Sequence, residues 1–176
     1  MSEKQRCTSY TEQNNDKERM EHEAQTNVPQ PSEAQDNEPQ ELEAISAELE
    51  ALGQDSLDEC FNILAEGEEL WPFVAYETKN GKRFALSFTD DDKERCLEEA
   101  RNFLSQEADL IRYTLVYEGF IKDDEDELLQ EALLFEFSEQ GMQAAYSGYC
   151  LYEHDEISGQ CYCSQPYPAG IVDSLL

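Results

Sequence analysis

The sequence predicts an α+β protein with a two-layer, mainly antiparallel sheet of about five strands and one central helix packed on a face. One or two short N-terminal helices and a disordered acidic arm are expected to precede it. Three observations predict this: residues 1–40 contain no Leu, Ile, Phe, Trp or Gly, apolar residues then recur at helical spacing, and strand-like alternation follows from residue 70. The expected parts are an arm (1–40), short amphipathic helices (41–69) and an α+β domain (70–176).

The arm holds three of the six prolines and carries nine acidic residues against four basic ones. Such a segment buries too little apolar surface to offset the roughly 1–2 kcal/mol per residue that backbone ordering costs. We therefore expect residues 1–40 to be disordered.

Two short helices are expected next. Gly53 is placed to end the first of them. The second begins with the capping-box spacing of Ser56 and Glu59, and Gly67 is expected to stop it. The apolar stripe of the first helix falls at i, i+3, i+7 and i+10: Leu42, Ile45, Leu49 and Leu52.

The α+β domain should open with a hairpin of residues 73–78 and 82–88. Asn80-Gly81 suits a two-residue type I′ turn, which would set Ala75 opposite Leu86. That register places five mostly apolar side chains on one core-facing side: Phe73, Ala75, Phe84, Leu86 and Phe88.

A helix is expected over residues 89–107, with Thr89 as N-cap and three Asp residues in the first turn, where they favour the helix dipole. Alternating patterns predict strands at 110–121, 128–138, 144–152 and 160–163, and short connections favour antiparallel pairing. Pro166 and Pro168 are expected to end regular structure. The acidic run 123–127 lacks the glycine and distal Glu of a calcium-binding loop, so a hairpin tip is the simpler interpretation.

Charge and motifs narrow the classes of function. The chain has 41 Asp+Glu against 12 Lys+Arg, a net charge of −29, which disfavours nucleic acid and membrane surfaces as partners. No apolar run approaches the ~20 residues of a membrane-spanning helix. The start, MSEKQRCTSY, has no apolar core of a secretory leader, so we expect a cytoplasmic protein with reduced thiols.

One Cys/His group is a candidate metal site: Cys150, His154, Cys161 and Cys163. Three thiols and an imidazole suit structural zinc, but the spacing C-x3-H-x6-C-x-C lacks the C-x2-C pair that wraps the metal. We therefore expect no metal and no cofactor. No G-x-S-x-G, H-E-x-x-H, P-loop or G-x-G-x-x-G motif is present, so the sequence predicts no catalytic residues and no enzyme.

Tyrosines gather toward the C-terminus, and Tyr is favoured both in strands and at recognition surfaces. We expect four of them to form an interaction surface: Tyr146, Tyr149, Tyr152 and Tyr162. The sequence thus predicts a small acidic protein–protein interaction module without enzymatic activity, whose partner is another protein, and it leaves a homodimer open. The alternatives are a metal protein or enzyme that uses the Cys/His group, and a nucleic-acid mimic or secretion-chaperone-like binder of a basic or apolar partner.

Overall fold

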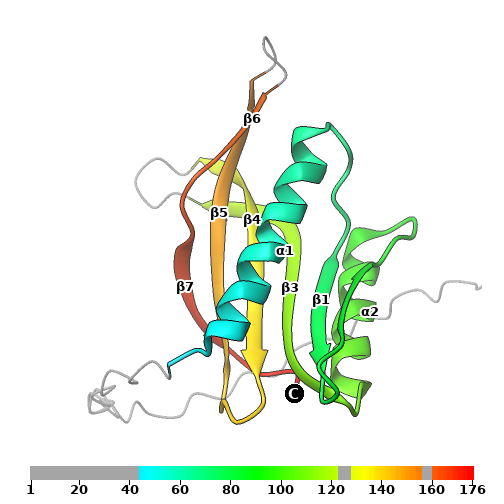
Figure 1. The fold of residues 1–176 in the computed structure, drawn as a ribbon. Helices are drawn as coiled ribbons and strands as arrows, with labels where there is room; N and C mark the ends of the chain where they lie inside the picture. The colour runs from blue at the N-terminus through cyan, green and yellow to red at the C-terminus, as the bar shows by residue number, and fades with distance from the viewer. Residues whose placement is uncertain (1–43, 123–127, 156–159) are drawn as a thin grey trace, which may run out of the picture. The chain divides into compact units, whose positions relative to one another are not determined.

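The computed structural model describes residues 44–122, 128–155 and 160–176, all within one unit, 41–176. The expected arm and the acidic run 123–127 lie outside the described residues. The described residues form two helices and a seven-stranded antiparallel sheet, which confirms the α+β class; Figure 1 shows the helices packed against the sheet. In chain order the elements are α1 (Ala47–Ala65), β1 (Phe73–Thr78), β2 (Arg83–Ser87), α2 (Lys93–Gln106), β3 (Leu110–Lys122), β4 (Leu129–Glu139), β5 (Ala145–Asp155), β6 (Gln160–Cys163) and β7 (Tyr167–Val172).

The strand order is β2-β1-β3-β4-β5-β6, and β7 also pairs with β5. β6 and β7 follow one another along the same edge of β5, which makes seven strands rather than about five. Between them Ser164 N donates to Leu151 O at 2.8 Å, and Leu151 N donates to Ser164 Oγ at 2.9 Å. The expectation that Pro166 and Pro168 end regular structure is wrong, because an edge strand tolerates residues without an N–H.

The N-terminal helical region is one continuous helix, α1, and not two. Gly53 lies inside it, and the Ser56 hydroxyl donates to Leu52 O instead of capping a new helix. The buried stripe runs unbroken through Leu49, Leu52, Ser56, Leu57, Cys60 and Leu64. Burying each leucine contributes roughly 1.5–3 kcal/mol, which exceeds the ~1 kcal/mol that an interior glycine costs.

The two helices cover opposite faces of the sheet, so the prediction of two layers with one helix-covered face is wrong. Alternate residues of β1 separate the two cores: Phe73 and Ala75 pack with α1, whereas Val74 and Tyr76 pack with α2. Both faces of β1 are therefore buried, and in Figure 1 β1 and β3 lie between α1 and α2. The result is a three-layer arrangement over the β1–β3 half of the sheet.

The β1–β2 hairpin forms, but its register differs by one residue from the expected one. Ala75 faces Ala85 rather than Leu86, because the loop has three residues and Gly81 takes a φ of 74° at its end. Asn80 stabilises this loop by accepting from the Thr78 hydroxyl at 2.7 Å. Phe84 and Leu86 consequently share the α2 side of the sheet and stay partly exposed, at 43% and 38%.

Helix α2 is three residues shorter at its start than expected. Asp92, not Thr89, is the N-cap, and its carboxylate accepts from Glu94 N and Arg95 N. The chain end also packs on the α2 side, where Leu175 N donates to the Tyr113 hydroxyl at 3.3 Å. Neither described helix is long and apolar enough to span a membrane.

Candidate functional site

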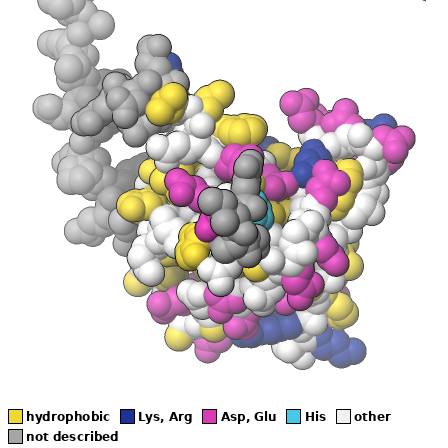
Figure 2. Space-filling model, turned by 90° about the horizontal axis from the view of Figure 1, so that it is seen from above, with side chains coloured by type: hydrophobic (Ala, Val, Ile, Leu, Met, Phe, Trp, Pro, Cys, Tyr) yellow, Lys and Arg dark blue, Asp and Glu magenta, His cyan; other side chains and the backbone are white. Residues whose placement is uncertain are grey.

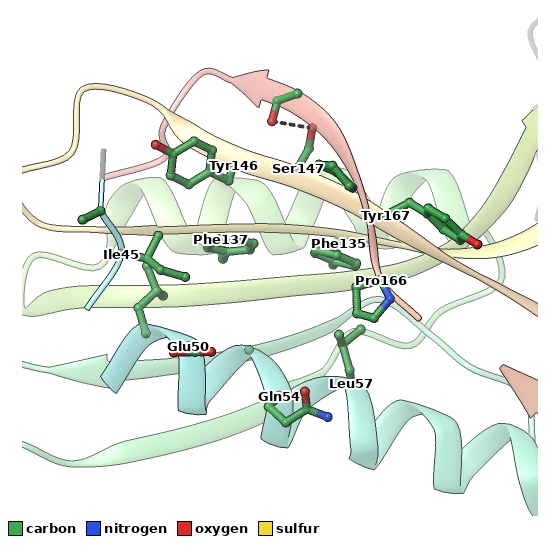
Figure 3. Close-up of a pocket in the computed structure, with 15 residues that line it drawn as sticks. Ile45, Glu50, Gln54, Leu57, Phe135, Phe137, Tyr146, Ser147, Pro166 and Tyr167 are labelled. Atoms are coloured by element: carbon green, nitrogen blue, oxygen red, sulfur yellow. Dashed lines mark hydrogen bonds between the residues drawn. The ribbon is translucent and has the colours of Figure 1, made fainter. Parts of the chain in front are cut away.

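An apolar groove lies between α1 and the β4–β5–β7 part of the sheet, and we call it the α1 groove. It encloses about 580 Å³. Figure 3 shows Ile45 and Leu57 on the helix side and Phe137 and Phe135 on the strand side. Its size and apolar walls are those of a site that takes an apolar group of another molecule.

The helix wall of the groove is held in place at its N-terminal end. Ser46 caps α1, its hydroxyl donates to Glu139 Oε2 at 2.6 Å, and its N–H donates to Glu139 Oε1 at 2.9 Å. Glu139 ends β4, so these bonds join the start of α1 to the sheet. Gly53 leaves a notch in this wall, because a Cβ atom there would meet nothing within 4 Å.

The sheet wall of the groove depends on one close approach. The ring of Phe135 lies directly over Gly148 of the neighbouring strand, and a Cβ atom on Gly148 would fall 2.6 Å from Phe135 Cε2. Phe137 continues the wall by stacking on Phe135, and Tyr146 packs on Phe137 with ring centroids 5.8 Å apart. Only glycine at position 148 lets the ring lie flat against the strand.

The groove lies in the acidic part of the molecule. Every Lys and Arg between residues 44 and 176 falls in the stretch 79–122, whereas the lining residues lie in 44–57 and 135–170. Within the described ranges six of these basic side chains form ion pairs with Asp or Glu. Glu50, on the groove wall, is exposed and makes no ion pair with any of the described residues. The segments that form the groove therefore carry a net negative charge.

The four tyrosines proposed as an interaction surface do not share one surface. Tyr146 lines the α1 groove. Tyr152 is on the same face but buried, and its hydroxyl donates to Glu118 Oε1 at 2.7 Å. Tyr149 lies on the opposite face, where its ring stacks on Tyr167, and Tyr162 is 55% exposed on β6.

A row of side chains crosses the face of the sheet opposite the groove, which is the side on which α2 packs. Strand pairing aligns Tyr117, Leu134, Tyr149 and Tyr167 on β3, β4, β5 and β7. Arg101 of α2 lies over the Tyr117 ring and pairs with the buried Glu136 beside it. This row, which we call the tyrosine row, is the main competing surface for the α1 groove, and Tyr167 at its β7 end also contributes to the lining of the groove.

The Cys/His group lies on β5 and β6. His154 pairs with Cys161 across the two strands, Cys150 is buried, and Cys163 is exposed. In the part of the chain that the structure describes, no three His, Cys, Asp or Glu side chains are placed to hold a metal ion. Desolvation and the neighbouring thiols raise the pKa of Cys163 to about 11, and burial raises that of Cys150 to about 11, so neither thiol is activated.

Because the Cys60 thiol in α1 is buried, we expect the stability of the fold to decrease at alkaline pH. Burial, aided by the nearby Glu59 carboxylate, raises its pKa from 9.0 to about 12. A raised pKa in the folded state means that the stabilisation is complete below about pH 9 and is lost as pH rises toward 12. The test is urea unfolding at pH 7, 9.5 and 10.5. Above pH 9 the free energy of unfolding of the wild-type chain should fall with pH, and Cys60→Ala should make this fall less steep by about 1.4 kcal/mol per pH unit. Equal slopes in the variant and the wild-type chain would contradict this assignment.

Comparisons with protein-family models, with curated proteins and with solved structures found no match for this chain. The site must therefore be interpreted from its own geometry. Sequence reasoning found one groove residue, Tyr146, and missed the rest, because the two walls come from segments far apart in the chain. One signal was present in the sequence: both wall segments lack Lys and Arg.

Proposed function

We propose that this protein is a protein–protein interaction module without enzymatic activity and that the α1 groove is its binding site. The observation that carries the proposal is a groove of about 580 Å³ whose walls are almost entirely apolar. An open apolar groove of this size is typical of a surface that a partner covers. The proposal replaces the tyrosine cluster with a site that includes only Tyr146 of the four.

The groove suits a helical segment better than an added strand. Leu49, Gly53 and Leu57 lie one helical turn apart along one wall, and aromatic rings form the other. A helix laid between them would present apolar side chains to both walls, as in helix-in-groove recognition. An extended segment would have to pair with β7, where Pro168 removes a backbone donor near the start of the strand, which begins directly after Pro166 of the preceding loop.

The polar groups of the groove do not suggest a catalytic reaction. Ser147 is the one serine among its described lining residues, and its hydroxyl donates to Gly170 O at 3.3 Å, the dashed line in Figure 3. Glu50 and Gln54 are the polar side chains that α1 contributes to the lining. No general base contacts the serine in this part of the structure, so we assign the groove to binding.

The experiment uses a 14-residue capped peptide with Leu at helical spacing and Gln at the other positions. Gly53→Leu fills the notch in the groove wall, whereas Ala51→Leu adds the same side chain on the exposed, opposite side of α1. We expect fluorescence anisotropy to show that Gly53→Leu weakens binding to the full chain by about tenfold or more and that Ala51→Leu changes it by less than about twofold.

Equal losses in the two variants, or no binding to the wild-type chain, would overturn the proposal. Circular dichroism of both variants checks that they remain folded. The Gly53 substitution is expected to be tolerated, because its Cβ meets no neighbouring atom within 4 Å.

A further inference from the structure

We infer that the α1 groove takes a basic amphipathic helix of another protein, with apolar side chains toward the groove and Lys or Arg at its flanks. This inference rests on the proposed function and adds the chemistry of the partner. It follows from two features together: the apolar walls, which accept side chains, and the absence of Lys and Arg from the segments 44–57 and 135–170 that form them.

The acidic surround is concentrated on the helix that forms one wall. Helix α1 carries five acidic side chains and no basic one: Glu48, Glu50, Asp55, Asp58 and Glu59. Two basic side chains lie near this helix in the described structure: Arg83 pairs with Asp55 at 3.6 Å, and Arg112 pairs with Glu139, the carboxylate that Ser46 binds. Glu50 lines the groove itself and stays unpaired within the described part of the chain. A cationic side chain at the flank of a bound helix would meet this carboxylate.

The length of the wall sets the size of the partner segment. The lining residues of α1 from Leu49 to Leu57 span about 12 Å at 1.5 Å per residue. Two to three turns of a partner helix match this length, with anchors at i, i+3 or i+4, and i+7. The partner segment is therefore expected to carry three apolar anchors.

Charge and composition disfavour two other occupants. A second copy of the chain would bring a net charge of −29 to a negative surface. The segment of residues 1–40 has no Leu, Ile or Phe to serve as an anchor, and it carries nine acidic residues against four basic ones. A basic amphipathic helix from a different protein matches both the apolar walls and the negative charge of the segments that form them.

Figure 2 views the domain from the end where β5 and β6 meet. On this face the Asp and Glu side chains lie singly and in small groups among apolar and neutral ones. A nucleic-acid mimic would instead present a regular stripe of carboxylates. No such stripe is visible on this face.

The test compares three capped 14-residue peptides with the same Leu positions and with Lys, Gln or Glu elsewhere, each titrated into the full chain by anisotropy. At 50 mM NaCl we expect the Lys peptide to bind about tenfold tighter than the Gln peptide and the Glu peptide to bind weaker than both. At 300 mM NaCl the advantage of Lys over Gln should shrink about threefold or more.

Four variants in matched pairs locate the binding. Glu50→Gln should lower the preference for Lys over Gln by about twofold or more, whereas Glu48→Gln, on the other side of α1, should leave it nearly unchanged. Gly53→Leu should weaken the Lys peptide about tenfold, and Ala51→Leu should not. If the Lys peptide is attracted to the acidic surface in general, the two members of each pair will not differ in their affinity for it or in their preference for Lys over Gln. That result would overturn the inference.

The remaining outcomes separate this inference from the proposed function. If the Gln peptide binds in the groove and Lys brings no advantage, the partner chemistry is wrong and the binding module stands. If no peptide binds, both fail. Tighter binding of a synthetic 1–40 peptide, or a concentration-dependent dimer that the Lys peptide dissociates, would assign the groove to the chain's own residues and overturn the inference.

Discussion

A chain that begins at Leu70 will not fold, whereas a chain that begins at Glu41 will. Helix α1 contributes five nearly fully buried side chains to the core on its side of the sheet: Leu49, Leu52, Leu57, Cys60 and Leu64. Four leucines at roughly 1.5–3 kcal/mol each amount to about 6–12 kcal/mol, comparable with the roughly 5–15 kcal/mol that stabilises a whole domain. Without α1 the sheet would also expose Leu133, Cys150 and Val116.

Far-UV circular dichroism and urea unfolding of the two truncated chains test this expectation. The 41–176 chain should show a cooperative transition, and the 70–176 chain should show none. A cooperative transition of the 70–176 chain with a similar midpoint would mean that the fold does not require α1. The core would then not fix α1 in place as one wall of the groove.

Gly148→Ala will destabilise the protein and disturb the groove together. The added Cβ would overlap the Phe135 ring and would lie 2.8 Å from the backbone oxygen of Tyr167. The ring must leave its place, or β7 must separate from β5, and such overpacking costs about 1–3 kcal/mol. We expect a lower urea midpoint and weaker binding of the Gln peptide.

Gly53→Ala is the matched control for this substitution. Its Cβ meets nothing within 4 Å and it lies in the interior of a helix, so we expect a gain of about 0.5–1 kcal/mol. Phe135→Leu makes room beside residue 148, so combining it with Gly148→Ala should cost less than the sum of the two single changes. Additive effects in this double-mutant cycle would show that the close approach of Phe135 to Gly148 is not what constrains the strand.

Local patterns predicted most of the strands because each one alternates within its own segment. The strand expected at 110–121 is found as β3 at Leu110–Lys122, and the one expected at 160–163 is found as β6. The hairpin was found as well, but not its register, because Asn80-Gly81 is compatible with loops of two and three residues. A difference of one residue moved Phe84 and Leu86 to the other face of the sheet.

The errors came from features that tertiary packing decides. Gly53 is a local stop signal, yet the buried stripe of α1 continues past it because the sheet covers both halves of the helix. The second helix-covered face could not be predicted from the hairpin pattern, since it depends on burying Val74 and Tyr76 as well as Phe73 and Ala75. Local sequence patterns could not predict the groove, because its two walls come from distant segments. Leu57 and Phe135, one on each wall, are separated by 77 intervening residues.

Methyl NMR measures directly where a partner helix binds. With Ile and Leu methyl groups labelled in the full chain, we titrate the Lys peptide and follow two sets of signals. Ile45, Leu49 and Leu57 line the α1 groove, whereas Leu134 lies in the tyrosine row on the opposite face. We expect saturable shifts of the first set of signals and no shift of the Leu134 signals. Shifts of Leu134 with Ile45, Leu49 and Leu57 unmoved would contradict this expectation.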